Sequence, residues 1–411
     1  MSHSGAPSDT GDITAPVLPD TATARRRWSI PPLPPLSLPL TGAIIFAGIR
    51  VLSVAIGWFL LRQGKFSDRH WSVVRWARAA DGGHYLAIAA HGYTYPAGQL
   101  AHASVFSFFP AYPAAMDSIA WLPGVTLVGA GLAVTAIAGL AAAWGITTLG
   151  MKLTADPRIS LLMVAVWGVA PASTVLEMLY AEALFCALAV WALVALVDRR
   201  WLTAAWLTIA AGTVRSTVLA LIAAVEVAAL AAVVGAARAR QPIARWWRPL
   251  AAALLAPLGL LGFLGYVALR THRLDGWFWI ESHTFHMAFD WGTSTLRVLK
   301  GDFVDAPSVP EILVGLAVIA GALLMVWSLT ERIPFYLHVY TVVVVGVALV
   351  TSANWIGSKP RFILPAILLA LPVARLLAPV RTSVLVPLFG VLTALSTWFG
   401  LYLIVIGRWA P

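Results

Sequence analysis

Charged residues are scarce in this chain. Only 11% of its 411 residues are charged, 60% are hydrophobic, and the mean hydropathy is +0.83. Soluble domains carry about 25% charged residues, so an ordinary soluble protein is excluded. Apolar runs of about 20 residues, the length that crosses a bilayer, recur along the chain. These runs lack the alternation of barrel strands, so the sequence predicts an all-α polytopic membrane protein.

Cysteine and several well-known motifs are also missing. The single cysteine, Cys186, lies in an apolar run, so it forms no intrachain disulfide and is expected to be a small buried side chain. No HExxH motif, glycine-rich nucleotide loop or internal repeat is present, which argues against a zinc hydrolase, a nucleotide-sugar donor and an inverted-repeat transporter. No cofactor is predicted firmly. A divalent metal at His84, His91 and His102 stays an alternative that no motif supports.

Basic residues dominate the few charges. The net charge is +10 and the pI is near 10.2, but the arginines lie in short connections between apolar runs, where they set topology and meet lipid phosphates. Nucleic acid is therefore not an expected partner. Residues 1–39 read as a disordered tail, and Arg25, Arg26 and Arg27 favour its placement in the cytoplasm.

About eleven spans are predicted within the integral-membrane domain 40–411. They are Leu40–Leu61, Val125–Gly150, Ile159–Leu176, Glu182–Val197, Trp201–Val214, Val218–Ala236, Leu250–Leu269, Ile312–Leu329, Pro334–Val350, Phe362–Leu377 and Val384–Ile406. The segment Val105–Leu122 is apolar but contains Pro110, Pro113 and Asp117, so we expect an interfacial or re-entrant helix there.

This span count places the basic connections on one side, which by the positive-inside tendency is the cytoplasm. The opposite, outer side then holds the first loop, residues 62–123, and an aromatic-rich loop, residues 271–310. The first loop nevertheless carries five cations, Arg62, Lys65, Arg69, Arg75 and Arg78. Binding of an anionic lipid head group would explain them; the alternative is that this loop is inverted. The plasma membrane is the expected location.

Asp81 in the first loop is the leading candidate for chemistry. It precedes a double-glycine turn, His84 and Tyr85, and a carboxylate with such neighbours suits a general base that accepts a proton from a hydroxyl group. Asp is also a favoured helix cap, so capping of a short helix over Tyr85–His91 is an equal alternative.

Other polar residues interrupt apolar sequence on the same predicted face. Glu177 and Glu182 flank Tyr180, and acids at such positions suggest function unless they form a plain solvated turn. Arg215, followed by Ser216, could bind a phosphate or extend to the interface. Lys359 and Arg361 are a second phosphate candidate. The stretch 275–292 adds Trp279 and Glu281 among tryptophans, which suit sugars, isoprenoid chains or an interfacial belt.

Five blocks in this order, DGGHYLAIAAHGY, SFFPAYP, LYAEALF, VRSTVLA and KPRFILPA, resemble the PIG-V-type mannosyltransferases of the GT-C group. The resemblance implies a GT-C-like helical bundle with membrane-parallel helices in the first outer loop. It also implies a polyprenyl-phosphate sugar donor. The family has Trp immediately before its loop acid, whereas this chain has Ala80, with Trp76 four residues earlier.

The resemblance also implies a role for one residue. Asp81 corresponds to the family's loop acid and is the expected catalytic residue. From their charge or their predicted place on the outer face, Arg215, Ser216, Lys359 and Arg361 are expected at the donor phosphate. The expected substrate pocket consists of His84, Tyr85, His91, Tyr93, Phe109, Tyr180, Glu182, Trp279 and Glu281.

The sequence therefore predicts a membrane glycosyltransferase that moves a hexose, with mannose as the first expectation. The acceptor would be a lipid, a glycan or a protein on the extracytoplasmic face. The alternative is a lipid or sugar transporter or flippase, which would use intramembrane polar sites in pseudo-symmetric halves. A structural subunit of an envelope-assembly complex is a third possibility, in which Asp81 would be replaceable.

Overall fold

The computed structural model describes residues 37–405 except 64–70, 95–102, 243–245, 305–308 and 353–355, together with Met1. Residues 2–36 of the predicted N-terminal tail, Lys65, Arg69 and His102 therefore lie outside the described residues, and α1 begins at Leu38, two residues before the predicted span. Residues 37–411 form one compact unit. Within the described residues this unit is helical, with one isolated β-bridge between Phe289 and Thr351.

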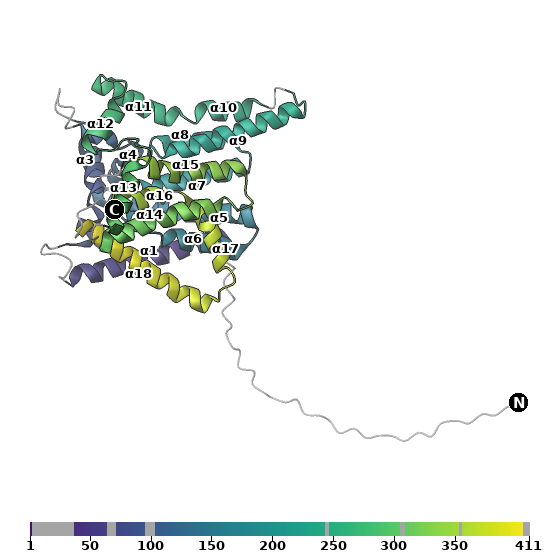
Figure 1. Ribbon diagram of the computed structural model, residues 1–411, viewed down its shortest axis with the longest axis horizontal. Coiled ribbons are helices and arrows are strands. Elements are labelled where there is room, and N and C mark those ends of the chain that lie inside the picture. Colours follow the sequence, from purple (N-terminus) through teal and green to yellow (C-terminus); the bar gives the residue numbers. More distant parts are fainter. Residues whose placement is uncertain are drawn as a thin grey trace, which may run out of the picture. The chain divides into compact units, whose positions relative to one another are not determined.

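The helices run mostly side by side, with α3 and α12 at one end of the bundle (Figure 1). In chain order they are α1 (Leu38–Arg62), α2 (Val73–Ala77), α3 (Asp81–His91), η2 (Ser104–Ser107), α4 (Ala111–Ala120), α5 (Leu127–Thr154), α6 (Pro157–Gly168), η3 (Ser173–Glu177), α7 (Glu182–Val197), α8 (Trp201–Gly212), α9 (Val218–Arg238), α10 (Trp247–Leu255), α11 (Leu258–Thr271), α12 (Gly276–Thr284), α13 (Thr293–Val304), α14 (Val309–Ser328), α15 (Phe335–Val350), η5 (Ile356–Ser358), α16 (Lys359–Ile363), η6 (Ile367–Leu369), α17 (Ala370–Leu377) and α18 (Thr382–Val405).

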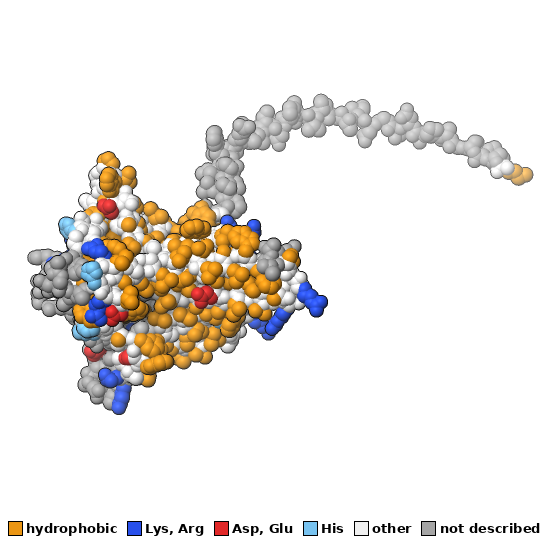
Figure 2. Space-filling model, turned by 90° about the horizontal axis from the view of Figure 1, so that it is seen from above, with side chains coloured by type: hydrophobic (Ala, Val, Ile, Leu, Met, Phe, Trp, Pro, Cys, Tyr) orange, Lys and Arg blue, Asp and Glu red, His pale blue; other side chains and the backbone are white. Residues whose placement is uncertain are grey.

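The prediction of a polytopic membrane protein is confirmed. Among the described residues, 6 helical segments are long and apolar enough to cross a bilayer, and five shorter apolar helices accompany them. Each corresponds to one of the predicted spans. Figure 2 shows the matching surface, a broad hydrophobic band with Lys and Arg gathered toward the two ends. Such an apolar surface suits the hydrocarbon of a bilayer, and the helices satisfy their backbone polar groups internally.

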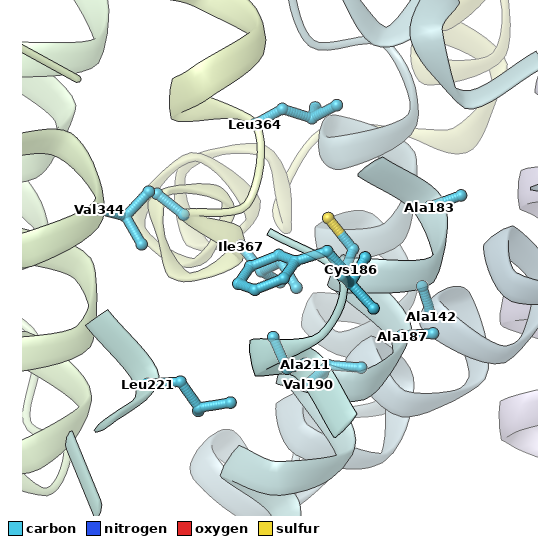
Figure 3. Packing of buried hydrophobic residues seen from close by; sticks show 14 of the residues in the cluster. Ala142, Ala183, Cys186, Ala187, Val190, Ala211, Leu221, Val344, Leu364 and Ile367 are labelled. Carbon is cyan, nitrogen blue, oxygen red and sulfur yellow. The ribbon is translucent and has the colours of Figure 1, made fainter. Parts of the chain in front are cut away.

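Helix α7 forms the centre of the packing. Its small and apolar side chains, among them Ala183, Cys186 and Val190, are buried, and in Figure 3 they lie among residues from α5, α8, α9, α15 and the chain after α16. Small residues let neighbouring helices approach closely, which is the main source of packing energy between helices in lipid. Cys186 is buried as expected.

Two predicted spans are broken. The run Ile159–Leu176 is helical only to Gly168, because Pro171 follows and Ala172 takes a positive φ of 62° before η3 begins. The run Phe362–Leu377 is divided between α16, η6 and α17, with Pro365 at the first break. Both breaks lie near the polar residues described below.

The basic connections meet at one end of the bundle. Lys152 binds Asp198 at 2.6 Å, and Arg375 binds Glu331 at 2.7 Å. The guanidinium of Arg158 donates to the backbone of Val380. Helix α7 runs from this end to the other, where it begins with Glu182. The segment predicted as interfacial holds only η2 and α4, and the ten residues of α4 extend about 15 Å, half of a hydrocarbon core.

Candidate active site

Asp81 is positioned by a tight turn between α2 and α3. Ala80 adopts φ 51° and ψ −119°, a conformation that costs an alanine about 1–3 kcal/mol, and the helix begins directly at Asp81. Gly82 then packs closely on the chain ahead of α7, since a Cβ there would lie 3.2 Å from the Ala77 carbonyl oxygen and 3.3 Å from Leu179 Cβ. The Leu179 N–H donates to that same Ala77 oxygen at 2.9 Å.

The carboxylate of Asp81 binds an arginine and does not cap its helix. The first helical residue is Asp81 itself, the N-cap is Ala80, and no side chain caps this end. Asp81 Oδ2 instead accepts a hydrogen bond from Arg361 Nη1 at 2.7 Å. Of the two sequence interpretations, the capping alternative is therefore wrong.

Arg361 joins Asp81 to a second, fully buried carboxylate. Its Nε lies 3.3 Å from Glu182 Oε1, and the Glu182 side chain has no exposed surface. The same Glu182 oxygen forms an ion pair with Arg215 Nη1. Burial alone would lower the pKa of Arg361, but Asp81 and Glu182 outweigh it and raise that pKa. The four side chains form a row of alternating charge at one end of the bundle.

Tyr180 completes this group. Its ring lies under the Arg361 guanidinium, 5.1 Å from ring centroid to Cζ, and its hydroxyl accepts a long hydrogen bond of 3.4 Å from the Asp81 N–H. We call Asp81, Tyr180, Glu182, Arg215 and Arg361 the site cluster. Its residues come from four separate parts of the chain: α3, the start of α7, the α8–α9 turn and α16.

The site cluster retains unused hydrogen-bonding capacity. Within the described part of the chain, Glu182 Oε2 and Arg361 Nε are buried and make no hydrogen bond that meets geometric criteria. Asp81 remains 22% exposed at its side chain, whereas Arg361 is 6% exposed. A substrate could therefore reach the group from the Asp81 side.

Aromatic side chains line the approach to Asp81. The His84 ring stacks on Phe108 with centroids 4.6 Å apart and meets Phe285 edge-on at 6.2 Å. Tyr85 is buried against Phe108 and Tyr112. Burial lowers the pKa of His84, opposed by the Asp81 charge. A neutral imidazole beside aromatic faces is a surface on which a sugar ring can lie.

Two further predicted pocket residues support this wall from behind. Phe109 is buried on Phe263, with ring centroids 4.4 Å apart, and near Trp277 at 6.1 Å. Tyr93 stacks on Phe106 at 5.4 Å and donates its hydroxyl to the Phe108 carbonyl at 2.6 Å. These contacts hold the segment Phe108–Pro110 against α11 and α12.

Helix α12 brings a third acid toward the site cluster. Burial raises the pKa of Glu281 to about 7; the Ser107 hydroxyl and Arg215 oppose that rise, while Asp81 adds to it. Trp279 stacks on His283 at 4.1 Å and lies beneath the Arg273 guanidinium at 5.4 Å. Glu281 therefore lies within electrostatic reach of Asp81 and Arg215, and Trp279 has its own local partners.

Three of the predicted site residues have other surroundings. The Lys359 ammonium donates to the carbonyls of Ala348 at 2.6 Å and Thr351 at 2.8 Å, at the carboxyl end of α15. Burial lowers the pKa of Lys359 to about 8, opposed by Asp290. His91 is exposed at the end of α3, and Ser216 is half-buried beside Arg215.

Sequence reasoning missed a second buried charge group. Arg50, in the middle of α1, donates from Nη1 to the Ser173 carbonyl at 2.8 Å and from Nη2 to the Gly168 carbonyl, with Glu177 Oε1 3.7 Å away. Ser53 donates to Glu177 at 2.5 Å and meets Thr397 of α18 at 2.7 Å. We call Arg50, Ser53, Glu177 and Thr397 the helix clamp. The available signal was a lone charge inside an apolar run.

The family described as Mannosyltransferase (PIG-V) matches residues 61–270. This range holds Asp81, Tyr180, Glu182 and Arg215, while Arg361 lies beyond it and joins them only through the fold. No curated protein matches the chain.

Proposed function

The chain belongs to the PIG-V mannosyltransferase family, and from this premise we propose that Asp81 is the general base of a mannosyl transfer from a polyprenyl-phosphate donor. The observation that carries the proposal is the ion pair of Asp81 with Arg361 at 2.7 Å, inside a group that also holds Glu182 and Arg215. A base and two phosphate-binding side chains then lie within one small site.

The reaction needs one bond to form and one to break. The acceptor oxygen attacks the anomeric carbon, the bond from that carbon to the phosphate oxygen breaks, and the polyprenyl phosphate leaves with the electron pair. Asp81 takes the acceptor proton, a step that contributes about 10²–10⁴-fold in such enzymes. Attack from the face opposite to the leaving group inverts the anomeric centre.

Arg361 and Arg215 would hold the departing phosphate. A guanidinium pairs with phosphate oxygens through two parallel hydrogen bonds, and both arginines are now bound by carboxylates that a phosphate can replace. Release of Arg361 from Asp81 would free that carboxylate to contact the acceptor hydroxyl. The buried Glu182 would keep both arginines in place between turnovers.

Lys359 and Ser216 have smaller roles in this proposal. Lys359 holds the carboxyl end of α15 against α16 and so places Arg361, two residues later. Ser216 could add a hydroxyl donor beside Arg215. His84, Tyr85, Phe109, Trp279 and Glu281 would shape the sugar and acceptor pocket, with Tyr93 and His91 at its edge.

The location of the site supports work on the extracytoplasmic face of the plasma membrane. Lys152, Arg158 and Arg375 lie at the end of the bundle opposite to the site cluster, and basic connections favour the cytoplasmic side. The acceptor would then be a lipid, a glycan or a protein outside the cytoplasm. The rival function, a transporter or flippase, is favoured by the buried Arg50–Glu177 pair alone.

The test is transfer of radiolabelled mannose from polyprenyl-phosphate mannose in membranes that carry the wild type or Asp81→Asn. Membrane glycolipids and polymers serve as the acceptor pool. We expect loss of about 10²–10⁴-fold in the variant. Asp117→Asn is the matched control, because Asp117 is an exposed acid of α4 outside the site cluster, and it should leave transfer unchanged.

The other outcomes decide between the alternatives. Full transfer by Asp81→Asn at equal expression would show that Asp81 is not the general base. Absence of transfer by the wild type, together with movement of labelled lipid between bilayer leaflets, would favour the flippase.

A further inference from the structure

An acidic residue lies on the lipid-facing side of the most apolar span. Helix α9 has a mean hydropathy of 2.5, the highest among the described spans, and Glu226 is exposed in it. Glu226 is eight residues after Val218, where α9 begins, which is about 12 Å along the axis. A glutamate side chain is too short to reach either membrane surface from there.

The residues around Glu226 show that this face meets lipid. Leu219 and Leu230, at the same face by helical spacing, are 48% and 64% exposed. Residues on the opposite face, such as Leu221 and Ala224, have no exposed surface. Glu226 therefore lies in the middle of an apolar stripe.

Glu226 has no hydrogen-bond or ion-pair partner within the described part of the chain. A carboxyl group in hydrocarbon is costly unless it is hydrogen-bonded. Ala223, three residues before it and half-buried, carries only a methyl group, so it leaves the carboxyl group uncovered. It also permits a second helix to approach closely, as small residues do at helix interfaces in membranes.

We propose that the Leu219–Glu226–Leu230 face of α9 is the interface of a homodimer in the bilayer. A neutral carboxyl group is both a donor and an acceptor, so the Glu226 of a second copy satisfies it completely, each hydroxyl donating to the other carbonyl oxygen. Two copies inserted in the same direction and related by a two-fold axis along the membrane normal bring Glu226 to itself at equal depth. No described cation of α9 lies between Val218 and Gly235 to pair with it instead.

The dimer is tested by cysteine cross-linking of the full chain in membranes. The single native cysteine, Cys186, is buried in the core, so wild type is the background. We expect Leu230→Cys to give a disulfide-linked dimer on oxidation. Leu323→Cys, at a 66% exposed lipid-facing position of α14, is the matched control and should stay monomeric.

Glu226 itself is tested in the Leu230→Cys background. Glu226→Leu should weaken the dimer about three- to thirty-fold, the range of interhelical hydrogen bonds in membranes, while Glu226→Gln, whose amide also pairs with itself, should retain it. Equal cross-linking at Leu230→Cys and Leu323→Cys, or a dimer unaffected by Glu226→Leu, would overturn the proposal. So would a cross-link from Leu230→Cys to a different protein. Mannosyl transfer is not the readout, so failure here leaves the function of the site cluster untouched.

Discussion

The site cluster and the helix clamp are both buried charge groups, but their arginines bind different kinds of partner. Arg50 of the helix clamp donates mainly to the backbone carbonyls of Gly168 and Ser173. Arg361 and Arg215 of the site cluster bind carboxylates. Backbone carbonyls are fixed parts of the fold, whereas carboxylates can yield a guanidinium to a phosphate. In our proposal, arginine thus has a structural role in the helix clamp and binds phosphate in the site cluster.

The two groups are linked along the chain. Glu177 of the helix clamp precedes Tyr180 and Glu182 of the site cluster by only a few residues. The helix clamp holds η3 against α1 and α18, and so determines where the next residues enter the site. Changes in the helix clamp should therefore affect stability, and changes in the site cluster should affect turnover.

The largest expected effect comes from Arg50→Met, which leaves Glu177 buried without its cation. Breaking a buried ion pair in this way costs about 3–5 kcal/mol of stability. The melting temperature of the purified protein in detergent should fall strongly. Replacing both partners, Arg50→Met with Glu177→Leu, should recover the part of the loss that comes from the unpaired Glu177 carboxylate, while the Gly168 and Ser173 carbonyls still lack their donor. An unchanged melting temperature in Arg50→Met would mean that the pair does not stabilise the fold.

Arg361→Gln should act on turnover. Loss of a donor that stabilises developing charge costs about 10²–10³-fold in rate, so kcat/KM for the lipid donor should fall by that order. Arg361→Lys keeps the charge without the planar pair of donors, so its kcat/KM should lie between those of the wild type and Arg361→Gln. The melting temperature should change less than for Arg50→Met, because Glu182 keeps Arg215. Wild-type kinetics in Arg361→Gln would remove Arg361 from the phosphate site.

Glu281 should make the stability depend on pH. Its pKa of about 7 lies above the ordinary value of 4.5, so the folded protein binds this proton more tightly than the unfolded chain does. The contribution of Glu281 to the free energy of unfolding is then fully present below about pH 4.5 and is lost as pH rises to about 7. The melting temperature should depend less on pH across this window for Glu281→Gln than for the wild type. The same pH dependence in both proteins would show that Glu281 is not buried in the folded state.

Tyr180→Phe is the mildest of these changes. It removes the hydroxyl that accepts the 3.4 Å hydrogen bond from the Asp81 N–H but keeps the ring beneath Arg361. A hydrogen bond of this kind contributes about 0.5–1.5 kcal/mol, so kcat should fall two- to tenfold by that estimate. Tyr112→Phe is the control, since its hydroxyl bonds Gly131 and Thr135 away from the site and should change only the melting temperature.

Sequence predicted the membrane architecture well because each span carries its own signal. Apolar length is local, so every predicted span has a helical counterpart. The break after Gly168 was missed although Pro171 lies beside it, because the group that binds the freed Gly168 carbonyl is Arg50, 118 residues earlier in the chain.

Site prediction had a different limit. Asp81, Glu182, Arg215 and Arg361 were identified singly, but nothing local indicates that Arg361 binds an acid 280 residues away. The partners of Lys359 were equally hidden, because backbone carbonyls leave no mark in the sequence. Arg50 and Glu226 are visible in the sequence as isolated charges, but each was overlooked because it lies inside a long apolar run.

The bond between Ser53 and Thr397 spans 344 residues. During synthesis, Ser53 and Glu177 are made long before α18, so Ser53 at first lacks Thr397 as a partner. Insertion of α18 adds Thr397 to the helix clamp, which holds the segment that leads to Tyr180 and Glu182. The candidate site would thus reach its final arrangement only after translation has passed Thr397, so its geometry depends on α18.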